Sequence, residues 1–306
     1  MAFRVFNLMG RGIGEQLTAA LPEVEVVDVG RDETPAEPAD VAFGWNDSPG
    51  FVNVVPLVPW VHLAGTGVDR VARDFYDGRI VTCSRGVSAV PIAEFVLAEI
   101  LAFEKRFPDV WLDAPPAHWN ISDLGELEGK TVAILGLGGI GTAIARRVLA
   151  FDVHVRALRR DPARGAPEGV ELAGDVVDLV RGADHLVLAA PATDATRHVV
   201  GDALLAHVKP GLHLVNIARG ALVDQEAMRI ALDDGRVARA SLDCVDPEPL
   251  PEGHWLYSHP KVKLSAHVSW ASPKAMGRVV SCFVANVRHR LAGEPLDGVV
   301  DPDAGY

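Results

Sequence analysis

The chain has 306 residues, of which 49% are hydrophobic and 23% are charged. This length fits two domains with a sizeable core, and the composition excludes a disordered chain. The formal net charge of −12 argues against a general binding surface for nucleic acid or anionic membrane. Cys83, Cys244 and Cys282 are far apart and give neither a disulfide framework nor the spacing of a metal knuckle, so we expect no metal site.

No apolar run is long enough for a membrane span, because proline or glycine interrupts every candidate. The first residues lack the charged and then apolar layout of a signal peptide. We therefore expect a soluble, cytoplasmic protein. Only a short segment follows the last predicted helix, so we expect no C-terminal regulatory domain.

Residues 1–90 alternate short apolar runs with polar breaks that contain glycine and proline. The apolar runs predict strands at 3–8, 24–29, 40–43, 60–63 and 80–81. The stretches 13–21 and 68–77 are interpreted as helices between them. Alternation of this kind predicts a small α/β unit with a parallel sheet.

A second and clearer α/β series follows an amphipathic helix at 91–103 and a loop at 109–120 that is rich in Trp and Pro. Its strands are predicted at 131–135, 153–157, 185–189, 213–217, 239–243 and 262–265. Its helices are predicted at 142–150, 175–180, 201–207 and 225–233. The near-continuous Val, Leu, Ile and Ala runs are expected of strands covered on both faces. A last helix at 273–291 can pack back on the first unit.

The strongest local signal is a glycine-rich segment between the predicted strand 131–135 and the predicted helix 142–150. It has the form G-x-G-x-x-G and comprises Gly136, Leu137, Gly138, Gly139, Ile140 and Gly141. Gly136 permits the tight turn, Gly138 lets the backbone approach a pyrophosphate, and Gly141 lets the helix pack on the strand. The helix N-terminus offers N–H groups and partial positive charge to phosphates. This context predicts dinucleotide binding; the alternative is a glycine-rich turn without a ligand.

The end of the next predicted strand bears on the choice between NAD and NADP. An NAD enzyme places Asp or Glu there to hold the ribose 2′-hydroxyl, whereas this chain has Arg159 followed by Arg160. A guanidinium can bind a 2′-phosphate through two N–H groups. We therefore favour NADP(H). The alternative is that both arginines are surface side chains and that NAD, or either cofactor, is used.

Three further polar segments follow strands of the same sheet, at the carboxyl edge where open α/β sheets bind ligands. They carry Arg219, Glu248 and His267. Reduction of a 2-oxo acid needs a proton donor for the oxygen that becomes negative, and a planar cation for the carboxylate. An Arg, a Glu and a His on adjacent loops suit that reaction.

These segments resemble the D-isomer-specific 2-hydroxyacid dehydrogenase family, which includes glyoxylate/hydroxypyruvate reductases and phosphoglycerate dehydrogenases. The likeness runs from about residue 60 to residue 291. It is carried by the glycine motif, His267 and the segments 65–69, 124–132, 216–220, 242–243 and 248–249.

The resemblance implies a role for each site residue. Arg219 would bind the substrate carboxylate and polarise the keto group. His267 would donate the proton in reduction, and Glu248 would hydrogen-bond His267 and stabilise the imidazolium. The backbone N–H groups of Thr66 and Gly67 would receive the substrate carboxylate from the other domain.

On the cofactor side, the resemblance implies that Asp243 holds the nicotinamide end and that Pro191 lines the cofactor site. The full predicted cofactor set is Gly136, Gly138, Gly139, Ile140, Gly141, Arg159, Arg160, Pro191, Ile217, Ala218 and Asp243. Other reactive side chains are interpreted as structural. Cys244 stands where the family has a small aliphatic residue and is interpreted as packing. His62, His154 and His213 fall in apolar strands and are expected in the core or at an edge.

The resemblance also implies two doubly wound α/β domains. A Rossmann coenzyme domain at 91–272 would be inserted into a smaller flavodoxin-like substrate domain made of 1–90 and 273–306, with cofactor and substrate in the cleft between them. The helix from Pro91 and the loop after it resemble the family's dimer contact, so we expect a homodimer.

The sequence therefore predicts an NADPH-preferring reductase of glyoxylate, hydroxypyruvate or a similar small acid. One alternative is an NAD-dependent dehydrogenase of another 2-hydroxy acid, such as phosphoglycerate. Another is a dinucleotide-sensing binding protein of the corepressor type. A third is formate or phosphite oxidation in the same fold, against which Glu248 argues, because family members for formate carry Gln near the His position.

Overall fold

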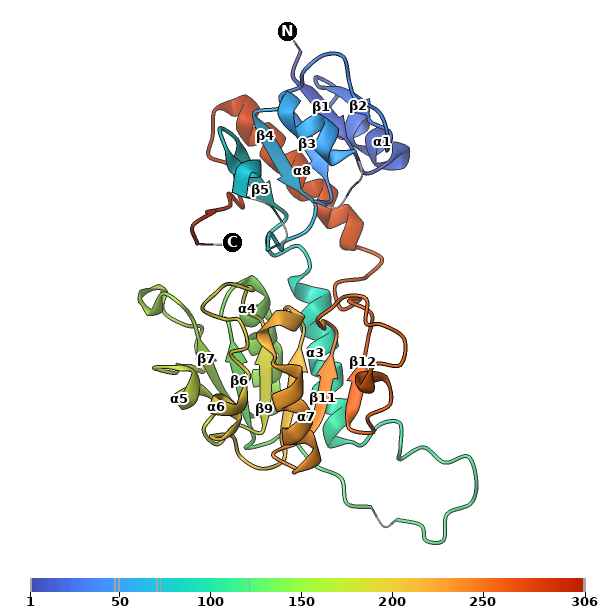
Figure 1. The fold of residues 1–306 in the computed structure, drawn as a ribbon, viewed down its shortest axis with the longest axis vertical. Helices are drawn as coiled ribbons and strands as arrows, with labels where there is room; N and C mark the ends of the chain where they lie inside the picture. Colours follow the sequence, from blue (N-terminus) through green and yellow to red (C-terminus); the bar gives the residue numbers. More distant parts are fainter. Residues whose placement is uncertain are drawn as a thin grey trace. The chain divides into compact units, whose positions relative to one another are not determined.

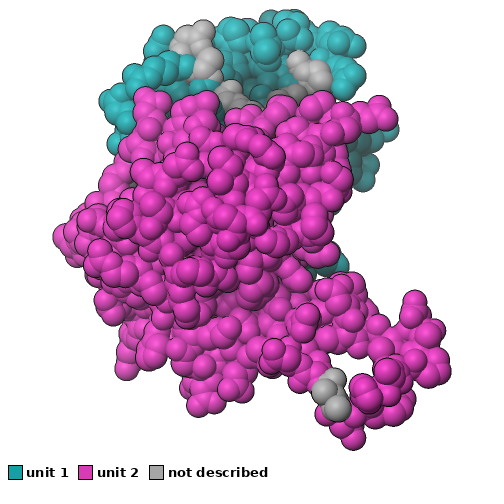
Figure 2. All heavy atoms as spheres, turned by 60° about the horizontal axis from the view of Figure 1, so that its bottom comes forward, with its two compact units in different colours: residues 1–87, 272–306 teal, residues 88–271 magenta. Residues whose placement is uncertain are grey.

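The computed structural model describes residues 2–46, 48, 50–69, 71, 73–120 and 122–304. The chain forms two compact units, coloured separately in Figure 2. Unit 1 comprises Met1–Val87 and Ser272–Tyr306, and unit 2 is Ser88–Ala271. Unit 2 is therefore inserted into unit 1. The sequence-based boundaries after residues 90 and 272 differ from these by a few residues.

Unit 1 contains a parallel sheet of five strands in the order β2-β1-β3-β4-β5 (Figure 1). The strands are β1 (Arg4–Asn7), β2 (Glu25–Asp28), β3 (Val41–Gly44), β4 (Trp60–Leu63) and β5 (Ile80–Cys83). This is the flavodoxin-like doubly wound order. All five predicted strands are confirmed, with small differences at their ends.

Helical elements cover both faces of this sheet. They are α1 (Arg11–Ala20), α2 (Phe51–Val54), the 3₁₀ turn η1 (Val55–Leu57) and α8 (Ala275–Ala292). Successive residues of a strand point to opposite faces of the sheet. Phe43 of β3 packs on one face with residues of α1 and α8, whereas Phe6 of β1 packs on the other face with residues of α2. The ring of Phe283 in α8 stacks on Phe43 with centroids 4.3 Å apart. The last helix, which was expected to return to the first unit, packs within unit 1.

The predicted helix at 68–77 is wrong. The structure has a short 3₁₀ turn there, η2 (Arg73–Tyr76), and residues 70 and 72 lie outside the described residues. The Arg79 side chain donates to the carbonyl oxygens of Phe75 and Asp77, which a longer helix would bond internally. Gly78 follows with a φ of 68° and ends the turn.

Unit 2 contains a parallel sheet of seven strands in the order β12-β11-β10-β9-β6-β7-β8. The strands are β6 (Thr131–Leu135), β7 (His154–Leu158), β8 (Val170–Leu172), β9 (His185–Leu188), β10 (Leu212–Asn216), β11 (Val237–Leu242) and β12 (Val262–Leu264). Strand order reverses between β6 and β9, as in a Rossmann sheet, and this reversal marks where such sheets bind ligands. The predicted fold class is confirmed. Six of these strands were predicted, and the short edge strand β8 was not.

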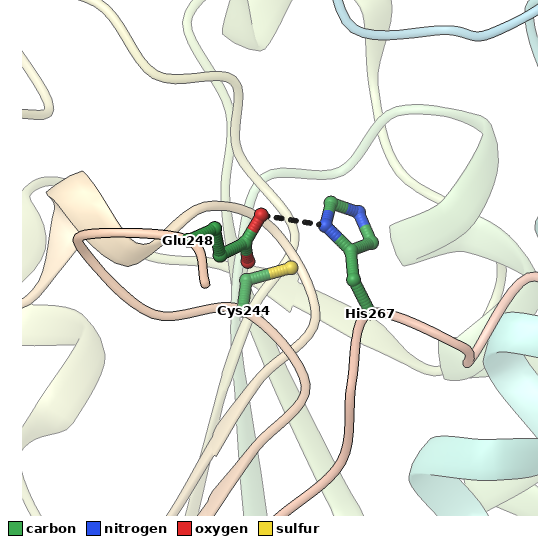
Figure 3. A group of neighbouring side chains, drawn as sticks. All are labelled: Cys244, Glu248 and His267. Atoms are coloured by element: carbon green, nitrogen blue, oxygen red, sulfur yellow. Dashed lines mark hydrogen bonds and ion pairs between the residues drawn. The ribbon is translucent and has the colours of Figure 1, made fainter. Parts of the chain in front are cut away.

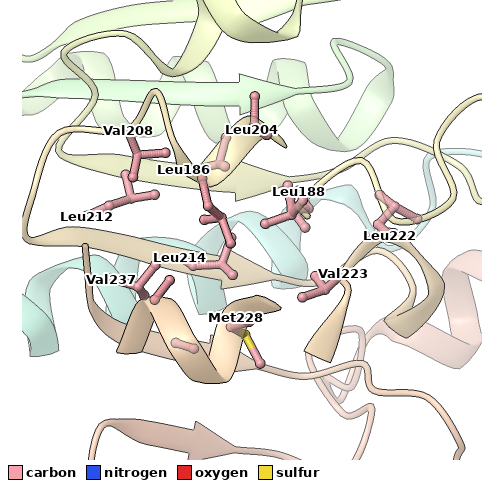
Figure 4. Packing of buried hydrophobic residues seen from close by; sticks show 14 of the residues in the cluster. Leu186, Leu188, Leu204, Val208, Leu212, Leu214, Leu222, Val223, Met228 and Val237 are labelled. Atoms are coloured by element: carbon pink, nitrogen blue, oxygen red, sulfur yellow. The ribbon is translucent and has the colours of Figure 1, made fainter. Parts of the chain in front are cut away.

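In the described part of unit 2, five helices flank the seven-stranded sheet. They are α3 (Ala89–Glu104), α4 (Gly139–Val148), α5 (Val176–Val180), α6 (Asp202–Leu205) and α7 (Gln225–Asp233). On one face, Leu186 of β9 and Leu214 of β10 pack in a cluster that includes Met228 of α7 (Figure 4). On the other, Ile134 and Val215 pack in a cluster with residues of α3 and α4. Each face of the sheet is therefore apolar, as in most parallel sheets.

An extended loop follows α3 and stands away from the body of unit 2 (Figures 1 and 2). Within it, Trp111 is 70% exposed and Trp119 is 73% exposed. The described part of the chain has no helix that combines the length and apolarity of a membrane span.

Candidate active site

The predicted catalytic residues lie in loops that leave the carboxyl edge of the seven-stranded sheet. Arg219 follows β10, Glu248 lies in the loop after β11, and His267 follows β12. The glycine turn beginning at Gly136 follows β6. Because all these strands are parallel, their carboxyl ends form one edge of unit 2, and the loops that carry the four residues leave the sheet at that edge.

His267 and Glu248 form a directly hydrogen-bonded pair (Figure 3). His267 Nδ1 lies 3.0 Å from Glu248 Oε2. Glu248 Oε1 accepts a hydrogen bond from the backbone N–H of Val245 at 3.1 Å, so both carboxylate oxygens are engaged. The His267 side chain is 40% exposed and that of Glu248 is 20% exposed. Because Glu248 occupies Nδ1, Nε2 is the ring nitrogen left for a substrate.

Asp243 organises the loop that presents His267. Its carboxylate accepts hydrogen bonds from Ser265 Oγ at 2.5 Å, Val268 N at 2.9 Å and Ser269 N at 3.0 Å. Burial alone would raise the pKa of this carboxyl, but the hydrogen bonds from Ser265, Ser269 and Val268 hold the pKa below its usual value. Asp243 is therefore an anion held inside the loop.

The backbone of His267 is strained at this turn. Its φ is 55°, in the left-handed region that only a few per cent of non-glycine residues adopt. Its N–H donates to the carbonyl oxygen of Asp243 at 2.9 Å, so the chain wraps around Asp243. Such a conformation costs of order 1–3 kcal/mol and persists where surrounding contacts fix it. Asp243, together with Ser265 and Ser269, provides those contacts.

Asn216 ties the Arg219 loop to the loop after β11. Its Nδ2 donates to the carbonyl oxygen of Arg219 at 2.9 Å and to that of Cys244 at 3.3 Å. A Cβ on Gly220 would lie 2.0 Å from the carbonyl carbon of Val245, so the two loops are in close contact. Arg219 is half-buried, and its position is thereby fixed relative to the loop that carries Glu248.

Ser265, Ser269 and Asn216 were not predicted as site residues. The signal for Asn216 is a polar side chain at the end of a fully buried strand. The signal for the serines is a pair of hydroxyl residues that flank His267 two positions away on either side.

The space around the three glycines of the turn fits a bound dinucleotide. A Cβ on Gly136 would lie 2.6 Å from the backbone N of Ala190, and one on Gly141 would lie 2.0 Å from the carbonyl oxygen of Gly136. A Cβ on Gly138, by contrast, would meet nothing within 4 Å. Gly138 is the N-cap of α4 and makes no side-chain cap. Two glycines thus serve packing, and the third leaves open space at a helix N-terminus, which suits a pyrophosphate.

The remaining predicted cofactor residues lie around this turn. Gly139 and Ile140 begin α4. The N–H of Gly136 donates to the carbonyl oxygen of Leu158 at 2.9 Å, which places the turn next to Arg159. Arg159 Nη1 donates to the carbonyl oxygen of Gly165 at 2.5 Å, and Arg160 follows directly.

Three more of these residues follow the central strands. Pro191, after β9, is exposed, and its carbonyl oxygen accepts a hydrogen bond from Thr196 Oγ1 at 2.7 Å. Ile217 and Ala218, after β10, are buried. Thr66 and Gly67 belong to unit 1, in the loop after β4, where Thr66 Oγ1 donates to the carbonyl oxygen of Ser84 at 3.1 Å.

A Rossmann sheet that carries a glycine turn and a His–Glu pair at its carboxyl edge is the arrangement expected of a nicotinamide-dependent dehydrogenase. Residues 97–269 match the family model described as "D-isomer specific 2-hydroxyacid dehydrogenase, NAD binding domain". The chain belongs to this family and is an NAD(P)-dependent D-2-hydroxyacid dehydrogenase. The resemblance seen in the sequence is confirmed.

Two curated relatives illustrate the range of similarity. The chain is 29% identical over 307 residues to a glyoxylate/hydroxypyruvate reductase A of Serratia proteamaculans, a match that covers 95% of this chain and 94% of that protein. It is 31% identical over 297 residues to a D-3-phosphoglycerate dehydrogenase of Mycobacterium tuberculosis, covering 95% of this chain and 54% of that protein. The chain thus spans about half the length of the latter.

Two solved structures share the whole fold. One is a D-isomer specific 2-hydroxyacid dehydrogenase from Xanthobacter autotrophicus in complex with NADPH and MES, with a TM-score of 0.84, 29% identity and coverage of 100% of this chain and 99% of that one. The other is an NADPH-dependent glyoxylate/hydroxypyruvate reductase from Sinorhizobium meliloti in complex with NADP and sulfate, with a TM-score of 0.85, 25% identity and full coverage of both chains.

Proposed function

We propose that this dehydrogenase reduces a small 2-oxo acid, such as glyoxylate or hydroxypyruvate, with NADPH. The observation that carries the proposal is the His267–Glu248 pair at the carboxyl edge of the Rossmann sheet. The names of the similar reductases from Serratia and Sinorhizobium support the substrate class.

The proposed cofactor site is built around the glycine turn. NADPH bound there would supply the hydride that reduces C2 of the substrate. The residues proposed to hold it are Gly136, Gly138, Gly139, Ile140, Gly141, Arg159, Arg160, Pro191, Ile217, Ala218 and Asp243. The carboxylate of Asp243 already accepts hydrogen bonds from Ser265, Val268 and Ser269. Asp243 is therefore proposed to have two roles, holding the His267 loop and contacting the nicotinamide end.

Arg159 and Arg160 support the preference for NADPH. Arg159 follows Leu158, whose carbonyl oxygen receives the N–H of Gly136. A guanidinium at this place is next to the turn that would hold the pyrophosphate, where the 2′-phosphate of an NADP ribose needs a cation. An acidic side chain there would repel that phosphate.

The proposed acid–base chemistry follows from the hydrogen bonds of His267. Nδ1 faces Glu248, so the proton passes from Nε2 to the keto oxygen as negative charge develops on it. Glu248 stabilises the cationic ring before the transfer. Arg219 binds the substrate carboxylate and polarises the keto group, and the backbone N–H groups of Thr66 and Gly67 are proposed as further donors to the carboxylate.

We further propose that the protein forms a homodimer through α3 and the loop after it. That loop exposes Trp111 and Trp119 to solvent, together with Leu112. Large apolar side chains grouped on a projecting segment are typical of an interaction surface.

The test is an initial-rate comparison of about ten 2-oxo acids, with NADPH and NADH in parallel. We expect turnover with glyoxylate or hydroxypyruvate and a preference for NADPH. His267→Asn should abolish turnover while cofactor binding, measured by NADPH fluorescence, stays intact. Near-normal turnover of that variant would refute the assignment of the acid. Cofactor binding without turnover of any 2-oxo acid by the unmodified protein would instead favour a dinucleotide-sensing protein.

A further inference from the structure

Cys244 contributes a thiol to the pair formed by Glu248 and His267. One ligand atom from each of the three residues, Sγ, a carboxylate oxygen and a ring nitrogen, lies within 4.8 Å of both others. In Figure 3 the Cys244 side chain points toward the space between the carboxylate and the imidazole. Cys244 directly follows Asp243, and the hydrogen bond from Asn216 to its carbonyl oxygen holds its backbone in place.

We propose that Cys244, Glu248 and His267 form an inhibitory site for a thiophilic divalent cation such as Zn²⁺. The inhibition rests on the proposed role of His267 as the proton donor, whereas the binding does not. The sequence-based interpretation of Cys244 as a packing residue agrees with its burial, and the proposal adds a role for its thiol.

The geometry needs little change to accept zinc. Three points no more than 4.8 Å apart all lie within about 2.8 Å of a common point, which is 4.8 Å divided by the square root of three. Zinc is held at about 2.3 Å by sulfur and about 2.0–2.2 Å by imidazole nitrogen or carboxylate oxygen. Each ligand atom therefore lies within about 1 Å of a zinc-binding distance from that common point.

The donor set selects the class of metal. A thiolate and an imidazole favour Zn²⁺ and similar borderline or soft ions over Mg²⁺ and Ca²⁺, which prefer oxygen ligands. Three protein ligands leave a fourth position for water. The Val245 N–H that bonds Glu248 Oε1 orients the carboxylate, as outer hydrogen bonds do in metal sites. Cys244 is 1% exposed, so the ion enters past His267 and Glu248, whose side chains are 40% and 20% exposed.

Binding of the cation removes the catalytic arrangement. The thiol releases its proton to solvent and binds as thiolate, and the carboxylate and imidazole exchange their mutual hydrogen bond for bonds to the metal. The imidazole nitrogen then shares its lone pair with the metal, and the ring no longer serves as the cationic proton donor. A chelator reverses the change.

The test compares the full-length protein with Cys244→Val and with Cys282→Ala, a matched control at another cysteine. Each is titrated with ZnCl₂ in metal-free buffer, and reductase activity is followed with NADPH and glyoxylate. We expect the unmodified protein and Cys282→Ala to be inhibited alike and to recover with EDTA. Cys244→Val, with its activity expressed relative to its own value without zinc, should need at least about tenfold more zinc for half-inhibition. Equal sensitivity of Cys244→Val would overturn the proposal.

A second measurement reads binding without turnover. Co²⁺ added to the unmodified protein should give a thiolate-to-cobalt charge-transfer band, which Cys282→Ala keeps and Cys244→Val lacks. Glu248→Gln and His267→Asn should weaken the cobalt affinity. If the protein turns over no 2-oxo acid but shows the band, the proposed function fails and the metal site stands. If the band is absent from the unmodified protein, or is kept by Cys244→Val, the metal site fails.

Discussion

Gly141 packs so closely on Gly136 that a Cβ at position 141 would lie 2.0 Å from the carbonyl oxygen of Gly136. That oxygen belongs to the backbone of the turn and cannot move away cheaply. Gly141→Ala should therefore force the start of α4 off β6 and lower the free energy of unfolding by about 1–3 kcal/mol. Urea denaturation, with NADPH binding measured in parallel, checks both losses.

Gly138→Ala is the matched control for this prediction. A Cβ at position 138 meets nothing within 4 Å, so the free energy of unfolding should stay within about 0.5 kcal/mol of the unmodified value. The added methyl group occupies the space proposed for the pyrophosphate, so NADPH binding should weaken strongly. Unchanged NADPH affinity in Gly138→Ala would place the cofactor phosphates elsewhere.

Glu248→Gln tests the partner of His267. The amide keeps an oxygen near Nδ1 but removes the negative charge that faces the ring, so a charged hydrogen bond is lost. Reductase kcat should therefore fall by roughly tenfold or more, while KM for the 2-oxo acid changes less. An unchanged kcat would show that the charge of Glu248 has no part in the proton transfer.

Arg219→Lys tests the proposed contact between Arg219 and the substrate carboxylate. A single ammonium cannot present two parallel N–H groups to a carboxylate, and a lost charged hydrogen bond costs about 1.5–3 kcal/mol, so KM should rise roughly tenfold or more. Arg229→Lys, at a half-exposed arginine of α7 that pairs with Glu226, is the control and should leave KM unchanged. Equal KM values for both variants would remove Arg219 from the substrate site.

Arg159→Asp tests the choice of cofactor. A carboxylate at the end of β7 repels a 2′-phosphate and can accept hydrogen bonds from the ribose hydroxyls of NAD. The ratio of kcat/KM for NADPH over NADH should fall below one. A ratio that does not change would mean that Arg159 has no part in recognising the 2′-phosphate.

His62 makes the stability of unit 1 depend on pH. Burial lowers the pKa of His62 from 6.5 to about 3. Between these values the unfolded chain binds a proton that the folded protein does not, so stability falls as pH falls below 6.5, by about 1.4 kcal/mol per pH unit. His62→Gln cannot titrate. Its unfolding free energy should be lower than that of the unmodified protein at pH 7.5 but should fall less steeply toward pH 5; parallel slopes would contradict the assignment.

The sequence allowed most strands to be predicted because their burial is continuous. All four residues of β9 are buried, and so are all five of β10, which gives long apolar runs. The edge strand β8 has only three residues, none of them buried, so its pattern does not differ from that of a loop. The single-turn helix α2 is too short to show a helical period.

The histidines in apolar strands show what local sequence can and cannot give. His62 and His213 were expected in the core or at an edge, and both are fully buried, whereas His154 is exposed at the start of β7. Their partners could not be predicted. His213 Nδ1 lies 3.2 Å from His185 Nδ1, and its Nε2 lies 3.0 Å from Ser241 Oγ, contacts that depend on the register of three strands.

The candidate site shows the same division. The glycine motif could be identified because its constraints are local to one strand, one turn and one helix. The hydrogen bonds from the His267 loop to Asp243 could not be predicted. The two segments are more than twenty residues apart and meet only when β11 and β12 pair. The approach of Cys244 to Glu248 and His267 depends on the same pairing.

The insertion of unit 2 sets an order for biosynthesis. Residues 88–271 leave the ribosome as one continuous piece, with every strand of their sheet present before α8 is translated. The core of unit 1, in contrast, stays incomplete during this time, because Phe43 lacks its stacking partner until Phe283 has been synthesised. The apolar surface around Phe43 therefore stays without its α8 cover until residues 275–292 have been synthesised.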